Sequence, residues 1–105
     1  MWAQLIKTRV KPGNDDRVKE LLEQLRSIEQ PDSGLLRSTA MVDQNDPNVL
    51  YLMVVFESEE HARAREQDPR RAEGLQAARA IMEEILDDAR EFVDLIVLEE
   101  TPNNE

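Results

Sequence analysis

The stretch Val49-Leu-Tyr-Leu-Met-Val-Val-Phe56 decides the fold of this 105-residue chain. Eight apolar or aromatic residues follow one another without a break, and the turn-forming sequence Gln-Asn-Asp-Pro-Asn at 44–48 precedes them. A strand of this composition carries apolar side chains on both faces, so both faces must be covered. The run is far shorter than the roughly 20 residues that cross a bilayer. We therefore expect a buried central strand of a water-soluble protein.

Three further segments have the composition of strands, namely residues 2–10, 35–43 and 91–99. Apolar residues recur at helical spacing at 15–28 and at 75–89. A shorter charged segment between the central strand and the second of these helices also has the pattern of a helix. The order strand, helix, strand, strand, helices, strand predicts an α+β, ferredoxin-like fold, in which a four-stranded antiparallel sheet carries its helices on one face.

Helices on one face leave the second apolar face of the central strands open to water. Apolar patches of that size are rarely left exposed. A second copy of the same sheet, packed face to face about a two-fold axis, would cover it. We therefore predict a homodimer in which the two sheets form a shared α/β barrel.

Composition limits the classes of function. The chain has 13 basic and 23 acidic residues and a formal net charge of −10, which repels phosphate backbones and anionic membrane surfaces, so neither nucleic acid nor membrane is an expected partner. Cysteine is absent and His61 is the only histidine, so we expect no disulfide and no metal site. Residues 1–99 are predicted to form a single domain, with a polar tail at 100–105. Lys7 and Arg9 interrupt any amino-terminal targeting segment, which makes a cytoplasmic protein the expectation.

Four short motifs occur in order along the chain. They are Val10-Lys-Pro-Gly13, Gly34-Leu-Leu36, Asn45-Asp-Pro47 and Phe56-Glu-Ser-Glu-Glu60, the last running into a segment that reaches Pro69. Over nearly the whole chain, from Trp2 to Leu98, this pattern resembles the antibiotic biosynthesis monooxygenase family. The resemblance implies a dimeric α/β barrel, and for some members the oxidation of polyketide quinols by oxygen without a metal, flavin or other cofactor; other members degrade haem.

The chain departs from the family at its usual catalytic positions. The family usually has tryptophan where this chain has Phe56, and often a histidine near Arg65. The asparagine of oxygenase members has no counterpart at Ile6 or Leu52. The departures argue against haem degradation and leave two hypotheses: a cofactor-independent oxygenase, or a non-catalytic binding or accessory protein on the same scaffold.

A ligand pocket is expected between the sheet and the helices. The first-strand face with Trp2, Gln4 and Thr8 would line it together with Phe56 and Arg65, giving aromatic walls and a few polar groups for a compact apolar or aromatic molecule. The alternative is that Trp2 and Phe56 are ordinary core residues.

The catalytic candidates from the sequence are His61, as a general base, and Arg65. The alternative for His61 is an exposed surface histidine. Arg65 belongs to the only basic cluster, with Arg63, Arg70 and Arg71, which could bind an anionic substrate or form a helix surface compensated by neighbouring acids.

Two charged residues lie on otherwise apolar strand faces. They are Arg37 and Asp94. Such charges must be paired or lie near a sheet edge or a water-filled cavity. If the two faces meet, an ion pair between Arg37 and Asp94 is one solution, within one chain or across the dimer.

Overall fold

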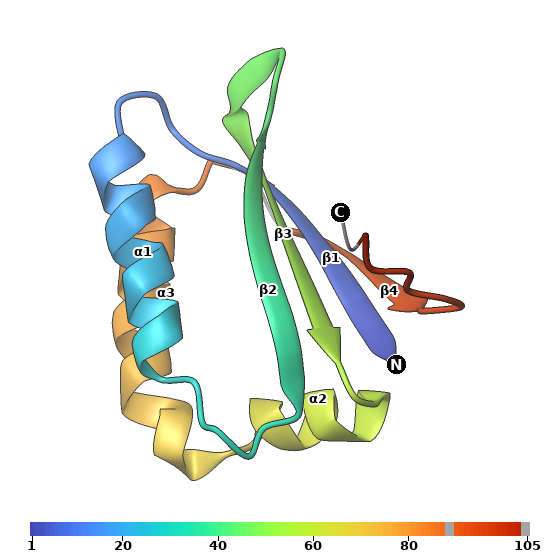
Figure 1. The fold of residues 1–105 in the computed structure, drawn as a ribbon. Coiled ribbons are helices and arrows are strands. Elements are labelled where there is room, and N and C mark those ends of the chain that lie inside the picture. Colours follow the sequence, from blue (N-terminus) through green and yellow to red (C-terminus); the bar gives the residue numbers. More distant parts are fainter. Residues whose placement is uncertain (88–89, 104–105) are drawn as a thin grey trace.

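The computed structural model describes residues 1–87 and 90–103. Within these residues the strands β1 (Trp2–Arg9), β2 (Leu35–Asp43), β3 (Asp46–Phe56) and β4 (Glu91–Ile96) form one antiparallel sheet in the order β2-β3-β1-β4. The helices are α1 (Asp15–Ser27), α2 (Glu59–Glu66) and α3 (Ala72–Ile85), and a 3₁₀ turn, η1 (Pro69–Arg71), joins the last two. Figure 1 shows α1 and α3 side by side on one side of the sheet. The predicted α+β, ferredoxin-like fold is confirmed.

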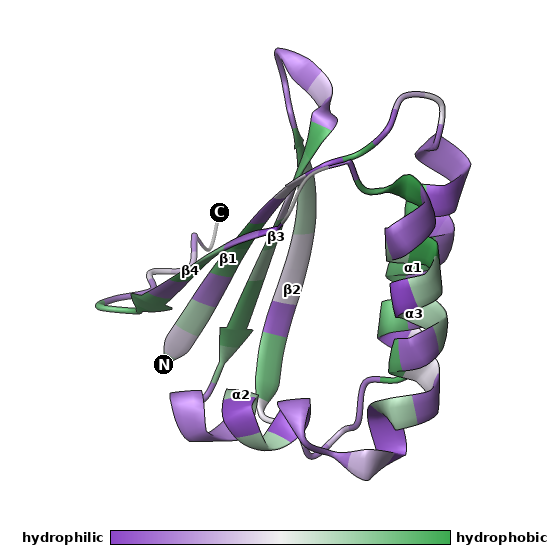
Figure 2. Ribbon diagram, turned by 180° about the vertical axis from the view of Figure 1, so that it is seen from behind, coloured by the Kyte–Doolittle hydropathy of each residue, from purple (hydrophilic) through white to green (hydrophobic). Residues whose placement is uncertain are grey.

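The central apolar strand β3 pairs with β1 from Trp2 opposite Phe56 to Arg9 opposite Val49. Because side chains alternate across a strand, this register places one set of side chains from both strands on the face toward the helices. The set consists of Trp2, Gln4, Ile6 and Thr8 from β1 and Leu50, Leu52, Val54 and Phe56 from β3. In Figure 2 the strand β3 is coloured mainly as hydrophobic, in contrast to the mainly hydrophilic helix α2.

The strand boundaries differ from those predicted at the β2–β3 turn. Asp43 pairs with Asp46, so the turn consists of Gln44 and Asn45 and not of all five residues at 44–48. The carboxylate of Asp43 accepts a hydrogen bond of 2.8 Å from the backbone N–H of Asn45, which closes the turn locally. The strand therefore begins three residues earlier than the apolar run indicates. Pro47 has no backbone N–H to donate, and it lies near a register shift, where the regular pairing of the two strands is interrupted.

The last helix is shorter than predicted. It ends at Ile85, because Leu86 is extended and forms a β-bridge with Val10. The N–H of Lys11 donates to the carbonyl of Ile85 at 2.8 Å, so the end of the first strand caps the end of the helix. Ala89, the predicted end, lies outside the described residues. The last strand is also shorter, ending at Ile96 instead of residue 99.

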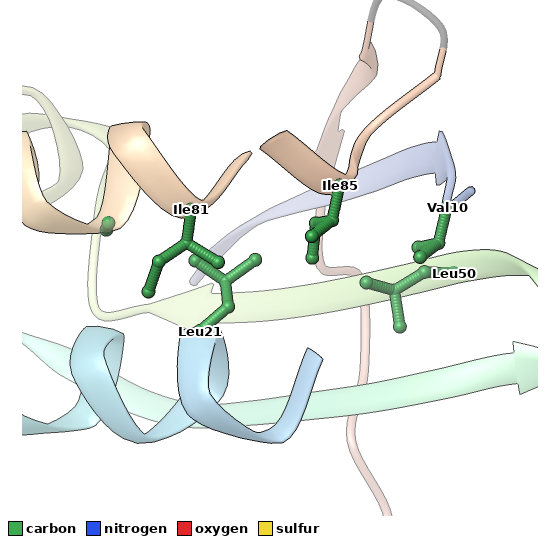
Figure 3. Close-up of a cluster of buried hydrophobic side chains, with 6 residues drawn as sticks. Val10, Leu21, Leu50, Ile81 and Ile85 are labelled. Atoms are coloured by element: carbon green, nitrogen blue, oxygen red, sulfur yellow. The ribbon is translucent and has the colours of Figure 1, made fainter. Parts of the chain in front are cut away.

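The core consists of two apolar clusters at opposite ends of the sheet. The larger one, shown in part in Figure 3, joins the sheet to both long helices through Val10, Leu21, Leu50, Ala78, Ile81 and Ile85. The second joins Trp2, Val54 and Phe56 to Ala62 of α2. The helices are therefore fixed to the sheet at its two ends.

The ion pair considered between Arg37 and Asp94 does not form within the chain, because the two faces do not meet. The register places Arg37 on the sheet face away from the helices, where it binds Glu100. Asp94 lies opposite Gln4, on the face toward the helices, and accepts hydrogen bonds from Gln4 at 2.9 Å and Arg63 at 3.3 Å. The two charges are separated by the sheet itself.

The segment after β4 lies on the side of the sheet opposite α1 and α3 (Figure 1). Its Glu100 reaches Arg37 of the far edge strand β2. Of the tail predicted at 100–105, residues 104 and 105 lie outside the described residues. None of the described helices has the length and apolar character needed to span a membrane.

Gly74 of α3 packs directly against Ile28, the residue that follows α1. A Cβ atom at this position would lie 1.9 Å from Cγ2 of Ile28. We expect Gly74→Ala to lower the free energy of unfolding, because overpacking costs about 1–3 kcal/mol whereas alanine in a helix gains only about 1 kcal/mol over glycine. Urea unfolding measures the change.

The control is the same substitution in an Ile28→Ala background, where the obstructing Cγ2 is gone. There Gly74→Ala should be neutral or stabilising by up to about 1 kcal/mol. Equal destabilisation in both backgrounds would show that this contact does not limit the helix spacing.

Candidate ligand-binding cavity

A cavity of about 770 Å³ lies between the sheet and the helices. Its sheet wall is the inward face of β1 and β3 described above, extended by Ser38 and Ala40 of β2. Its helix wall includes Leu22 and Leu25 of α1 and Leu75 of α3. The residues predicted to bind a ligand all contribute to the lining: Trp2, Gln4, Thr8, Phe56 and Arg65.

Aromatic side chains close one end of the cavity. The ring centroids of Trp2 and Phe56 are 6.2 Å apart with the rings tilted by 48°, and both residues are buried. The Arg63 guanidinium lies 5.2 Å from the Trp2 ring centroid, and that of Arg65 lies 5.3 Å from the Phe56 ring centroid. The two interpretations of Trp2 and Phe56 are thus compatible, since these residues belong to a core cluster and also form a cavity wall.

Arg65 is held by an ion pair with Glu29. Its Nε and Nη2 donate to Oε1 of Glu29 at 2.9 Å and 2.6 Å, and the two side chains are only 18% and 21% exposed. Burial by itself raises the pKa of Glu29, but hydrogen bonds from Arg65 and Ser33 and the charges of Arg65 and Arg71 outweigh it and hold that pKa below its usual value. Glu29 therefore stays ionised and neutralises Arg65.

Arg71 is the most deeply buried charged residue on the cavity wall, at 3% exposed. Its Nη1 donates to the backbone carbonyl of Arg65 at 3.1 Å, whereas Nε is buried and has no hydrogen-bond partner in the described part of the chain. Burial lowers the pKa of Arg71, and the neighbouring charge of Arg65 acts in the same direction.

The basic cluster is divided between two environments. Arg63 pairs with Glu59, Glu66 and Asp94, and Arg70 pairs with Asp32 and Asp68, so these two arginines form compensated surface contacts. Arg65 and Arg71 instead line the cavity. The local sequence does not indicate which of the four arginines line the cavity and which lie on the surface. The turn η1 places Arg71 inward and Arg70 outward.

The polar groups on β1 are satisfied to different degrees. The Gln4 side chain is fixed by its bond to Asp94. Oγ1 of Thr8 is buried and has no hydrogen-bond partner among the described residues. A buried hydroxyl without a partner costs free energy, so Thr8 is a group that a ligand or a water could satisfy.

His61 is absent from the described residues of the cavity lining. Its Nδ1 lies 2.6 Å from Oγ of Ser58, its Nε2 lies 3.3 Å from a carboxylate oxygen of Glu57, and its side chain is half-exposed. The ring packs against Gly34, whose φ is +81° and where a Cβ atom would lie 2.5 Å from Cδ2 of His61. This contact fixes the loop before β2, and the catalytic role considered for His61 stays a prediction.

No three His, Cys, Asp or Glu side chains within residues 1–87 and 90–103 come together in a way that would hold a metal ion.

The model of the antibiotic biosynthesis monooxygenase family matches residues 1–77. The chain belongs to this family. The resemblance seen in the four sequence motifs is thereby confirmed. No curated protein matches the chain.

Solved structures of antibiotic biosynthesis monooxygenase proteins share the fold. A putative member from Nitrosomonas europaea is 19% identical, with a TM-score of 0.74 over 94% of this chain and 100% of that one. A putative member from Caulobacter crescentus is 14% identical, with a TM-score of 0.77 over 93% and 90% of the two chains. A mutant of SnoaB, a cofactor-independent oxygenase from Streptomyces nogalater, is 14% identical, with a TM-score of 0.72 over 97% of each. Because the sequence identities are only 14–19%, the structural similarity establishes that the fold is shared.

The unpartnered hydroxyl of Thr8 generates a prediction about stability. In the absence of ligand, Thr8→Val should raise the free energy of unfolding by about 1 kcal/mol, because it replaces a buried hydroxyl that has lost its hydrogen bonds to water. Thermal and urea unfolding measure the effect. The matched control is Thr101→Val at an exposed residue after β4, which should change stability by less than about 0.5 kcal/mol. A destabilised Thr8→Val variant would mean that the hydroxyl is satisfied in solution.

Proposed function

We propose that this family member binds a compact apolar or aromatic small molecule in the cavity of each subunit and oxidises it with molecular oxygen, without a metal or organic cofactor. The observation that carries the proposal is the 770 Å³ cavity, walled by Trp2, Phe56 and aliphatic side chains. A cavity of this size, lined by aromatic and aliphatic side chains together with polar and charged ones, suits an organic molecule of drug-like dimensions.

The proposed chemistry needs little from the protein. Enclosure between sheet and helices excludes water and holds the substrate in one orientation, so that an electron-rich substrate reacts directly with oxygen. The arginine side chains on the wall would stabilise negative charge that develops on the substrate. Arg65, which lies over the Phe56 ring, is in position for this role, although its guanidinium does not act as a base.

A specific observation favours the second candidate, a non-catalytic binding or accessory protein. His61 faces Ser58 and Glu57 instead of the cavity, and Arg65 is engaged by Glu29. Both catalytic candidates from the sequence, His61 and Arg65, are therefore engaged in contacts within the chain.

Oxygen uptake distinguishes the two candidates. With a panel of aromatic quinols and no added metal or flavin, the wild type should consume oxygen faster than a protein-free blank. Ala40→Phe fills the cavity from β2 and should abolish both ligand binding and oxygen uptake, and Arg65→Ala should lower the uptake. The control is Arg70→Ala, outside the cavity lining, which should behave as the wild type.

Binding without oxygen uptake would favour the accessory role. Absence of binding by the wild type to every member of the panel would overturn the proposal.

We also propose that the protein acts in the cytoplasm as a homodimer through the sheet face away from the helices. Apolar side chains on this face that are not buried in the single chain come from each of the inner strands and from β4, namely Leu5, Met53, Val93 and Leu95. Val93 is 49% exposed in the single chain. A partner sheet would remove this apolar surface from water.

Light scattering tests the dimer. The wild type should give a mass of about 24 kDa, twice the 12.1 kDa of one chain, at micromolar concentration. Val93→Glu should shift the mass to that of the monomer, because it introduces a charge into the proposed interface. The matched control is Val42→Glu, at a residue 58% exposed that the register assigns to the helix side of the sheet. A monomeric wild type would contradict the sheet-on-sheet arrangement.

A further inference from the structure

Arg71 carries a buried positive charge without a counter-ion. It is 3% exposed, and no carboxylate of the described residues lies within ion-pair distance of its guanidinium. The carboxylates whose charges act on Arg71 are already engaged, since Glu29 binds Arg65, Asp68 binds Arg70 and Glu66 binds Arg63. Its single assigned hydrogen bond goes to the neutral carbonyl of Arg65. A buried charge in this situation is costly unless a further group compensates it.

The cavity wall is positively charged although the protein is strongly acidic. Among the described residues of the lining there are five arginines and two glutamates: Arg26, Arg65, Arg71, Arg79 and Arg90, with Glu29 and Glu66. The whole chain has a formal net charge of −10. An excess of cations gathered around one cavity in such a chain favours an anion inside it.

The arrangement of the lining suits a molecule with one charged end. Arg71 lies at the end of the cavity formed by α2 and η1, near Arg65 and Phe56. Beyond it the wall continues with the aliphatic side chains of Ile6, Leu25 and Leu52 toward Thr8. Residues 2 to 8 of a β-strand span about 20 Å, so the apolar part of a ligand has room to lie along β1.

We propose that the ligand of this cavity is an organic carboxylate whose headgroup pairs with Arg71 and whose hydrocarbon part lies along the inward face of β1. The planar guanidinium matches the two oxygens of a carboxylate, and the aliphatic side chains of the wall along β1 match a hydrocarbon part. This inference rests on the proposed ligand-binding function and names the chemical class of the ligand.

Decanoate and 1-decanol test the inference as probes with the same hydrocarbon chain and different headgroups. Trp2 is the only tryptophan of the chain and lines the cavity, so its fluorescence reports binding of either probe. At neutral pH the wild type should bind decanoate at least about tenfold more tightly than decanol, as expected for a charge-assisted pair. This comparison needs no variant that might fail to fold.

Variants then identify the residue that is responsible for the preference for decanoate over decanol. Arg71→Gln should reduce the preference for decanoate to less than about twofold and leave decanol binding unchanged. Arg70→Gln, the adjacent arginine on the exposed side of η1, should keep the wild-type preference. Ala40→Phe should abolish binding of both probes. Circular dichroism establishes that each variant is folded.

A failure of the proposed ligand-binding function can be distinguished from a failure of the inferred ligand class. If neither probe binds the wild type, the ligand-binding function itself is wrong. If both probes bind equally well, the cavity binds small molecules but the inferred class of ligand is wrong. If Arg70→Gln loses the preference as completely as Arg71→Gln, the effect is one of overall charge, and the assignment of the headgroup to Arg71 is overturned.

Discussion

The antiparallel pairing of β1 with β3 is the constraint on which the rest of the structure depends. It places Trp2 opposite Phe56 and Thr8 opposite Leu50, and thereby selects which side chains face the helices. Because the side-chain period of a strand is two residues, a register slip of one residue would turn every one of them to the opposite face. The aromatic wall, the orienting amide of Gln4 and the unpartnered hydroxyl of Thr8 all follow from this one register.

The cavity exists because the helices are fixed to the sheet at its two ends. At one end Ile81 and Ile85 of α3 pack with Val10 and Leu50, and at the other Ala62 of α2 packs with Trp2 and Phe56. A chain with so few aromatic residues fills these two ends and leaves the middle open. The same separation that forms the cavity removes apolar contacts from the core, so stability depends strongly on the two clusters.

The fold and the composition of the sheet wall could be predicted because both follow from local periodicity. Alternation along residues 2–8 identifies the inward face of β1, and helical spacing identifies α1 and α3. The end of α3 could not be predicted, because it depends on the pairing of Leu86 with a residue far away in sequence, Val10. The burial of Arg71 depends on the geometry of a three-residue turn, and among four arginines of similar local sequence no pattern indicates which one faces inward.

The pairing of β1 with β4 has a consequence for how the chain folds during synthesis. The bond from Gln4 to Asp94 joins residues 90 positions apart, whereas β2 and β3 are joined by a turn of two residues. The local hairpin can therefore form early on the ribosome, while the outer edge of β1 waits unpaired until β4 has emerged. During that interval β1 exposes an unsatisfied strand edge, and its charged residues Lys7 and Arg9 oppose premature pairing with other nascent chains.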